Sequence, residues 1–126
     1  QVINLRIRGN IIEQKDEFKY LGVLLDQTLS FAKHIDVISG NALRAMAKIS
    51  GLHRGRRGIS IPTGIKLFQA LIRAHFENAA PVWAGLSMNN MNQLEKLQAQ
   101  CLRKILGVHN NSSANAVEVI AGVMPV

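Results

Sequence analysis

The apolar residues of the chain change their spacing near residue 30, and this change limits the fold more than any other feature. From Ile35 onward they recur every three or four positions in three successive stretches, which is the pattern of helices with one buried face. The three stripes are Ile35, Ile38, Ala42, Met46 and Ile49; Ile65, Phe68, Leu71, Ile72, Phe76 and Ala79; and Met91, Leu94, Leu97, Cys101 and Ile105. Short connections predict that helices adjacent in the chain pack antiparallel.

Residues with strong preferences for helix ends mark the limits of the first two helices. Ser30 is suited to cap the first helix, which should end near Gly51. Pro62 suits the first turn of the second helix. Pro81 should kink or end that helix, because proline interrupts the backbone hydrogen bonds.

The C-terminal part of the sequence predicts a third main helix and a short fourth one. Ser87 is suited to cap the third helix, and Gly107 suits its C-terminal end. The fourth should run from Ala114 to Ala121 and end at Gly122. The expected core is shared by all three main helices: Ile38, Met46, Ile49, Phe68, Leu71, Ile72, Leu94, Leu97, Cys101 and Ile105.

The N-terminal 25 residues follow a different period and predict a small antiparallel β unit. Ile3, Leu5 and Ile7 alternate with polar residues, as in a half-buried strand. Gly9–Asn10 is a plausible tight turn, and a further strand is expected from about Phe18 to Leu25. The predicted fold class is therefore mainly α, a three-helix bundle with a short fourth helix and a small N-terminal β unit.

Positive charge is concentrated in the middle of the chain. The formal net charge is +7, and no acidic residue occurs between Asp36 and Glu77. The basic residues of this span are Arg44, Lys48, Arg54, Arg56, Arg57, Lys66 and Arg73. Their densest part, "GLHRGRRGIS", has two interpretations: a solvated surface loop, or a loop that contacts phosphates.

Several classes of function are disfavoured. The single cysteine, Cys101, excludes an internal disulfide framework, indicates a reducing intracellular setting, and falls on an apolar stripe where we expect it to be buried. The four histidines are too far apart for a local metal motif, and His75 should pack at the edge of the core. No apolar run reaches the length that spans a bilayer, and no paired carboxylates for two-metal nucleotidyl transfer are present.

One stretch, "FKYLGVLLDQTLSFAKHI", resembles the segment that follows the catalytic palm in reverse transcriptases of non-LTR retrotransposons, the long-interspersed-element type. The matching residues are Tyr20, Leu21, Gly22, Val23, Leu25, Asp26, Leu29, Phe31, His34 and Ile35. Three later stretches are similar to that family's thumb region in the same order. "LFQALIRAHFENAAPVWAG" keeps Trp83 but has Asn78-Ala79 in place of Tyr-Gly. "LEKLQAQCLRKILG" keeps Gln98 and Arg103, and "AVEVIAGVMPV" has Val117 in place of a leucine.

The resemblance covers about residues 3 to 126 and implies a primer grip at 1–27 followed by a helical thumb-like domain at 28–126. It implies an RNA template and a DNA primer as partners, the rest of the polymerase chain as a further partner, and a cytoplasmic and nuclear location. No Tyr-x-Asp-Asp motif is present. Magnesium would therefore be bound by a palm outside this chain. We expect the chain itself to hold no cofactor and to be inactive alone. The implied nucleic-acid-binding residues are Lys19, Tyr20, Leu21, Gly22, Arg44, Lys48, Arg54, Arg56, Arg57 and Lys66.

Two other interpretations remain open from the sequence. The helices could form a protein-interaction module with no role in nucleic-acid binding. Alternatively, "RRGISIPTGIKLFQALIRAHF" could be a helix-turn-helix DNA reader, although its second helix is too apolar to leave a face for base edges.

Overall fold

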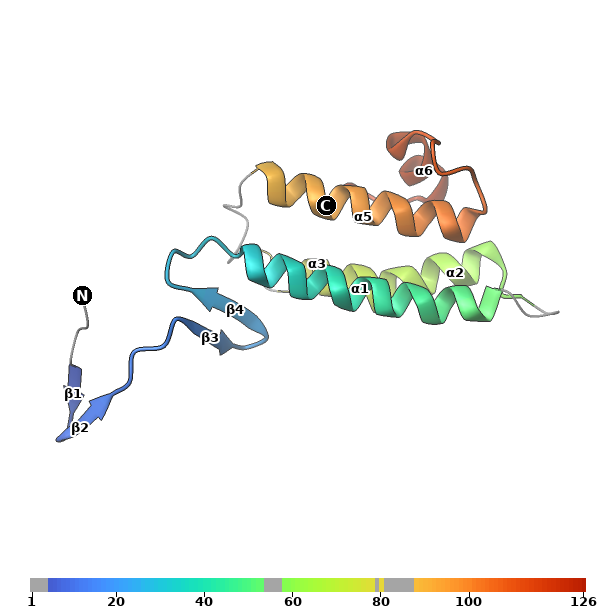
Figure 1. Cartoon of the computed structure of the whole chain (residues 1–126). Helices are drawn as coiled ribbons and strands as arrows, with labels where there is room; N and C mark the ends of the chain where they lie inside the picture. The colour runs from blue at the N-terminus through green and yellow to red at the C-terminus, as the bar shows by residue number, and fades with distance from the viewer. Residues whose placement is uncertain (1–4, 54–57, 79, 81–87) are drawn as a thin grey trace.

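Helices make up most of the structure, a computed structural model that describes residues 5–53, 58–78, 80 and 88–126 (Figure 1). Helix α1 spans Ala32–His53. A second helical segment consists of α2 (Ile61–Phe68), the π-helical turn η1 (Gln69–Arg73) and α3 (Ala74–Glu77). Helices α5 (Met88–Leu106) and α6 (Ala114–Ala121) follow. The mainly α fold class predicted from the sequence is confirmed.

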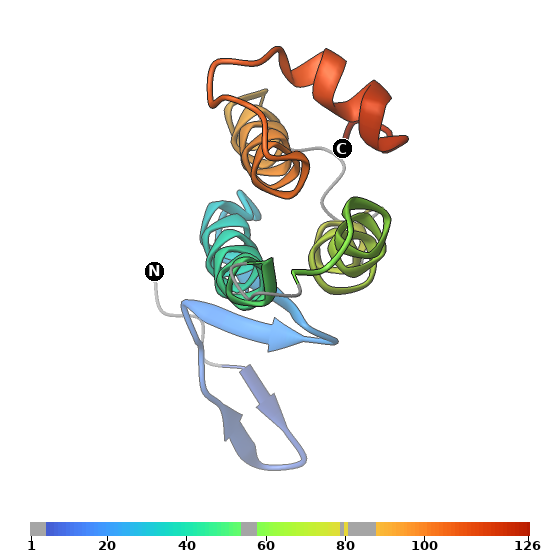
Figure 2. The same ribbon diagram turned by 90° about the vertical axis from the view of Figure 1, so that its right-hand side faces the viewer.

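Three helical segments form the bundle. Viewed along their length in Figure 2, α1, the α2–η1–α3 segment and α5 occupy the corners of a triangle. The α2–η1–α3 segment runs antiparallel to α1, and α5 runs antiparallel to α2–η1–α3 (Figure 1). Helix α6 contacts α5. Adjacent helical segments therefore alternate in direction, as their short connections predicted.

The core is built from the predicted stripes with one exception. Among the ten residues expected to form it, nine are buried: Ile38, Met46, Ile49, Phe68, Ile72, Leu94, Leu97, Cys101 and Ile105. The prediction for Leu71 is wrong, because its side chain is 45% exposed. The buried face is centred on Phe68, Ile72 and Phe76. Leu71 precedes Ile72 by one residue in the π-helical turn, so its side chain projects in a different direction around the helix axis. His75 is also exposed rather than packed at the core edge.

Capping residues explain where several helices begin and end. Ser60 caps α2 by accepting a hydrogen bond from the Thr63 amide, and Pro62 lies in the first turn as expected. Gly107 and Gly122 follow α5 and α6 with φ of +68° and +64°, the left-handed conformation that favours glycine. Helix α1 continues past Gly51 to His53. Pro81 and Ser87 lie outside the described residues.

The β unit consists of two separate antiparallel hairpins within the described part of the chain. Strand β1 (Leu5–Ile7) pairs with β2 (Asn10–Ile12), and β3 (Glu17–Tyr20) pairs with β4 (Val23–Asp26). The turn of the first hairpin is at Arg8–Gly9, one residue earlier than predicted. The prediction of one continuous strand from about Phe18 to Leu25 is wrong, because the chain reverses at Leu21–Gly22.

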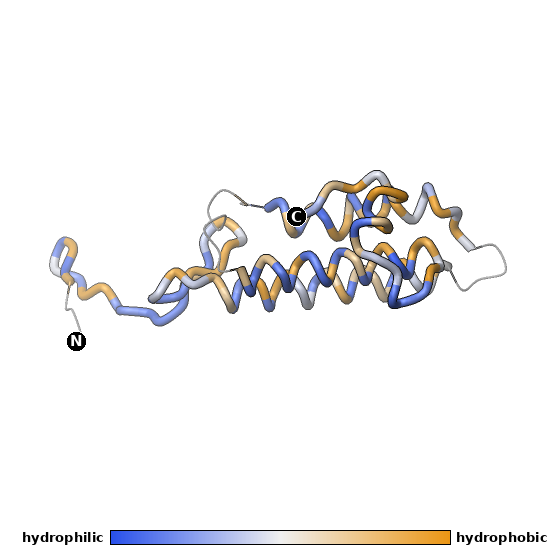
Figure 3. Tube along the Cα trace, turned by 90° about the horizontal axis from the view of Figure 1, so that it is seen from above, coloured by the Kyte–Doolittle hydropathy of each residue, from blue (hydrophilic) through white to orange (hydrophobic). Residues whose placement is uncertain are grey.

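The first hairpin does not share the helical core. Leu5 and Ile7 are 59% and 61% exposed, so the prediction that they line a half-buried face is wrong. Figures 1 and 3 show this hairpin, with its hydrophobic positions, extending away from the helices. The alternation of apolar and polar residues predicted the strand correctly. Alternation alone does not determine whether another element packs against that strand.

A buried polar network holds the chain's last residues against the bundle. The Gln98 side chain on α5 is fully buried, and its amide nitrogen donates to Glu118 Oε1 on α6 at 2.9 Å and to the Met124 carbonyl at 3.0 Å. Arg73 donates to the same carbonyl and to Glu77. Because these groups satisfy one another, the polar side chains are accommodated inside the fold.

Cys101 lies at the centre of α5 as a buried apolar residue. Its side chain is almost entirely inaccessible, and burial raises the pKa of the thiol to about 11. The thiolate form is therefore scarce at neutral pH, which makes this cysteine a poor nucleophile.

Candidate nucleic-acid interface

The β3–β4 hairpin reverses direction in a two-residue turn with an unusual leucine. Leu21 and Gly22 have φ of +46° and +87°, and both positive values are typical of a type I′ turn. Asparagine or glycine usually occupies the first of these positions, because left-handed backbone is unfavourable for other side chains. Leu21 is also 81% exposed, so its side chain gains little burial in return.

Gly22 is constrained from within the chain. A Cβ atom at this position would lie 3.1 Å from Nδ2 of Asn78, which follows α3. The family resemblance implied that Gly22 contacts nucleic acid. The structure shows a close approach to the chain's own side chain, and the positive φ requires glycine independently.

The exposed side of the hairpin combines apolar and basic side chains. Phe18 and Tyr20 are two positions apart on β3 and therefore lie on the same face of the strand. Both are exposed, as is Lys19. Together with Leu21 they form the hairpin tip, the name used below for Phe18–Gly22. The hairpin tip brings together four of the residues that the sequence implied in nucleic-acid binding.

Side chains of β4 and α1 attach the hairpin to the bundle. Val23 is buried, and the Leu24 amide donates to Nδ1 of His34 at 3.3 Å. His34 is itself buried, and Nε2 makes no hydrogen bond within the described part of the chain. Burial lowers the pKa of His34, which favours the neutral imidazole that accepts the Leu24 proton.

Asp26 closes the connection between β4 and α1. Its carboxylate accepts hydrogen bonds from the Thr28, Ser30 and Phe31 amides at 2.9 to 3.0 Å and from the Thr28 and Ser30 hydroxyls at 2.8 Å. Donation by Ser30 and Thr28 holds the Asp26 pKa well below its ordinary value of 3.8. Ser30 caps α1 as the sequence suggested, because its hydroxyl oxygen accepts a hydrogen bond from the amide of Ala32, the first residue of the helix, at 3.3 Å. Asp26 holds the loop that leads into this cap.

We expect Asp26→Asn to destabilise the chain at neutral pH and to change its response to acid. The lowered pKa in the folded state means that the carboxylate stabilises the fold above about pH 4. This contribution is lost as the pH falls through the folded-state pKa. The difference in urea midpoint between parent and variant should therefore stay constant from about pH 7 to about pH 4 and shrink progressively as the pH falls below about 4.

The control is Asp36→Asn, which removes the same charge from an exposed site whose carboxylate accepts one long hydrogen bond, 3.4 Å from Gln93. A difference for Asp26→Asn that stays constant below about pH 4 would contradict the proposed role of the Asp26 carboxylate in holding this loop.

The basic residues of the acid-free span fall into three groups. Arg44 and Lys48 are exposed and lie four residues apart on α1, hence on one face one turn apart. Lys66 is exposed on a different helix, α2. Arg73 is engaged in the buried network and does not belong to an open surface. Arg54, Arg56 and Arg57 lie outside the described residues.

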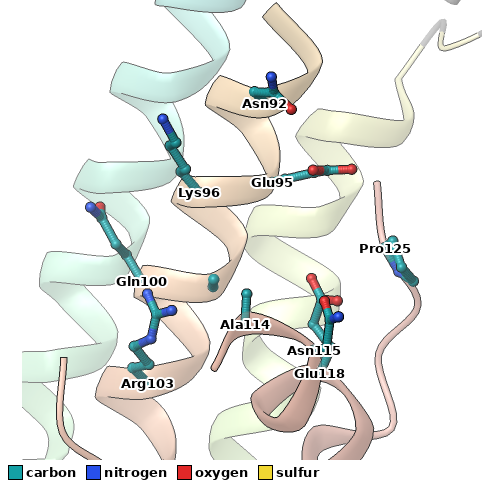
Figure 4. Close-up of a pocket in the computed structure, with 10 residues that line it drawn as sticks. Asn92, Glu95, Lys96, Gln100, Arg103, Ala114, Asn115, Glu118 and Pro125 are labelled. Carbon is teal, nitrogen blue, oxygen red and sulfur yellow. The ribbon is translucent and has the colours of Figure 1, made fainter. Parts of the chain in front are cut away.

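Shallow hollows flank the exposed side of α5. One, of about 330 Å³, lies between α5 and α6 and is lined in part by Glu95, Lys96 and Glu118 (Figure 4). A second, of about 420 Å³, lies between α5 and α1 and is lined in part by Ser39 and Leu43. Asn92, Lys96 and Gln100 border both hollows. None of these α5 residues was among the binding residues implied by the sequence.

The chain is similar in sequence to known RNA-directed DNA polymerases. The chain is 30% identical over 101 residues to the RNA-directed DNA polymerase from mobile element jockey of Drosophila funebris, and 27% identical to its Drosophila melanogaster counterpart over the same length. It is 25% identical over 96 residues to the probable RNA-directed DNA polymerase from transposon X-element of Drosophila melanogaster. The curated homologues are RNA-directed DNA polymerases of non-LTR retrotransposons.

These matches cover most of this chain but a small part of each relative. They cover 76% to 80% of this chain but only 11% of each polymerase. No family model matches the sequence, and no solved structure matches the chain. The resemblance inferred from the sequence motifs is confirmed, and the roles of the individual residues remain predictions.

Two further observations limit the chemistry of the described residues. Within them, no group of three or more His, Cys, Asp or Glu side chains is arranged to hold a metal ion. No helix in the same part of the chain is long and apolar enough to span a membrane.

Proposed function

We propose that this chain is the primer-grip and thumb part of an RNA-directed DNA polymerase and that it holds the template–primer duplex through backbone contacts. Homology to RNA-directed DNA polymerases over four-fifths of the chain carries this proposal. In this proposal, residues 1–27 form the primer-grip segment and residues 28–126 the thumb. RNA template, DNA primer and the rest of the polymerase are its partners, and magnesium is bound elsewhere in the polymerase.

The hairpin tip supports the primer-grip assignment. Leu21 is in an unfavourable backbone conformation and is almost fully exposed, so neither local geometry nor core packing accounts for it. Strained, exposed side chains occur preferentially where they contact a ligand. Tyr20 and Leu21 would contact the primer end, while Val23, His34 and Asp26 hold the hairpin on α1.

Charge on α1 supports the thumb assignment. Arg44 and Lys48 project from the side of the helix opposite its buried residues, so both side chains can reach a polyanion. Contacts of basic side chains with phosphates are independent of sequence and weaken as salt rises. Lys66, exposed on α2, is a further candidate for phosphate contact.

Binding measured against salt concentration tests this proposal. The chain should bind an RNA–DNA hybrid, and replacing Arg44 and Lys48 with Gln should weaken binding to every duplex sequence alike. The slope of log affinity against log salt should decrease by up to about 0.9 for each phosphate that the variant no longer neutralises.

The matched control replaces Lys104 and Lys15, two exposed lysines outside the acid-free span, with Gln. If both pairs of substitutions change the slope equally, the effect reflects net charge rather than a surface on α1. If the parent chain does not bind the hybrid at low salt, the proposed function is wrong.

A helical protein-interaction module is the second candidate. The observation that favours it is the apolar surface of the C-terminal region, where Val119, Ile120 and Met124 are all largely exposed. This candidate predicts little binding to nucleic acid even at low salt, so the same titration separates the two functions.

A further inference from the structure

A row of amide side chains lies on the exposed side of α5, apart from the basic residues of α1 and α2. Asn89, Asn92 and Gln100 are exposed, and Lys96 lies between the last two. Asn92, Lys96 and Gln100 follow one another at intervals of four residues, so they project from neighbouring turns of the same face. From Asn89 to Gln100 the row extends over about 16 Å.

The amide groups of this row are available for binding. The side chains of Asn89, Asn92 and Gln100 form no hydrogen bond with other residues that the structure describes. By contrast, Gln98 on the opposite face of α5 is committed to Glu118 and the Met124 carbonyl. Figure 4 shows Lys96 and Gln100 on one side of α5, with Glu95 directed to the other side. The row therefore combines open hydrogen-bonding groups with one positive charge.

The shape of this surface suits a shallow groove. The row stands between the hollow that α5 shares with α6 and the hollow that it shares with α1, so it forms a ridge. RNA in an A-form duplex presents a wide, shallow minor groove in which the 2′-hydroxyl groups are displayed. A helical ridge can follow such a groove, whereas the deep, narrow major groove of the same duplex would exclude it.

The chemistry of the row matches the sugar of RNA. A carboxamide both donates and accepts hydrogen bonds, and so does a 2′-hydroxyl group. Lys96 can pair with a phosphate beside the sugar that its neighbours contact. We propose that the amide row of α5 recognises the RNA strand of a duplex through its 2′-hydroxyl groups. This inference rests on the proposed function and adds to it a means of distinguishing RNA from DNA.

The test compares two hybrids that differ only at the sugar. One pairs RNA with DNA, and the other replaces each ribose 2′-hydroxyl with fluorine, which removes the hydrogen-bond donor. The parent chain should bind the ribose hybrid about three to ten times more tightly, the effect of one or two net hydrogen bonds. Replacing both Asn92 and Gln100 with Ala should abolish this ratio and leave the salt slope unchanged, because no charge is removed.

A matched variant replaces two exposed amides outside the row, Gln69 and Asn111, with Ala and should keep the parent's ratio. Thermal unfolding of each variant shows whether it is folded. If the parent binds both hybrids equally, or if the Asn92/Gln100 variant retains the parent's ratio, the inference is wrong while the proposed function stands. If the parent binds neither hybrid at low salt, both are wrong.

Discussion

Ile72→Ala is expected to lower the free energy of unfolding by about 2 to 5 kcal/mol, the range for deleting a buried aliphatic side chain. Ile72 is fully inaccessible and belongs to the core shared by α1, the second helical segment and α5. Its removal would leave a cavity that the surrounding helices cannot fill completely, so the loss includes both transfer and packing terms.

The neighbouring substitution Leu71→Ala provides the control. It deletes a side chain of the same size from the adjacent position, but Leu71 is nearly half exposed. We expect it to cost less than about 1.5 kcal/mol. Urea unfolding of both variants at equal concentration measures the difference. Equal losses for the two variants would show that the buried face of this helical segment has been assigned incorrectly.

Gly22→Val should destabilise the β3–β4 hairpin by about 1 to 3 kcal/mol. A branched side chain is strongly disfavoured at a φ of +87°, and the new Cβ would approach Asn78 Nδ2 at 3.1 Å. We expect the effect to be largest in amide hydrogen exchange at residues 17–26, which form the hairpin.

Leu21→Asn is the matched substitution in the same turn, and its expected effect has the opposite sign. Asparagine tolerates left-handed backbone better than leucine, so exchange from the hairpin should slow. If Leu21 contacts the primer, a polymerase carrying Leu21→Asn should nevertheless extend primers more slowly per folded molecule. Faster exchange in the Leu21→Asn variant would contradict the turn assignment. Unchanged extension would remove Leu21 from the proposed primer contact.

Much of the helical architecture could be predicted because it depends on local periodicity. The stripe on α5 placed Leu94, Leu97, Cys101 and Ile105 correctly, and α6 begins and ends at the residues predicted. These features follow from the 3.6-residue repeat and from glycines that end a helix, both properties of a short window of sequence.

The candidate site depended more on tertiary structure. The sequence motifs drew attention to Gly22, Asp26 and His34, but only the folded chain shows Asn78 beside the glycine and the Leu24 amide on the imidazole. The role of Gln98 was also inaccessible from spacing, since its partners are Glu118 and the Met124 carbonyl, 20 and 26 residues away.

The sequence by itself determined which residues form helices, which faces of those helices are apolar, and which polymerases the chain resembles. Only the tertiary structure decided how far each apolar face is covered. Leu71 and Ile72 are both aliphatic neighbours on one helix, yet one is exposed and the other buried. In the first hairpin, Leu5 and Ile7 alternate with polar residues as in a half-buried strand, yet both are exposed. Periodicity records the direction of a side chain, whereas burial requires a second element packed against it.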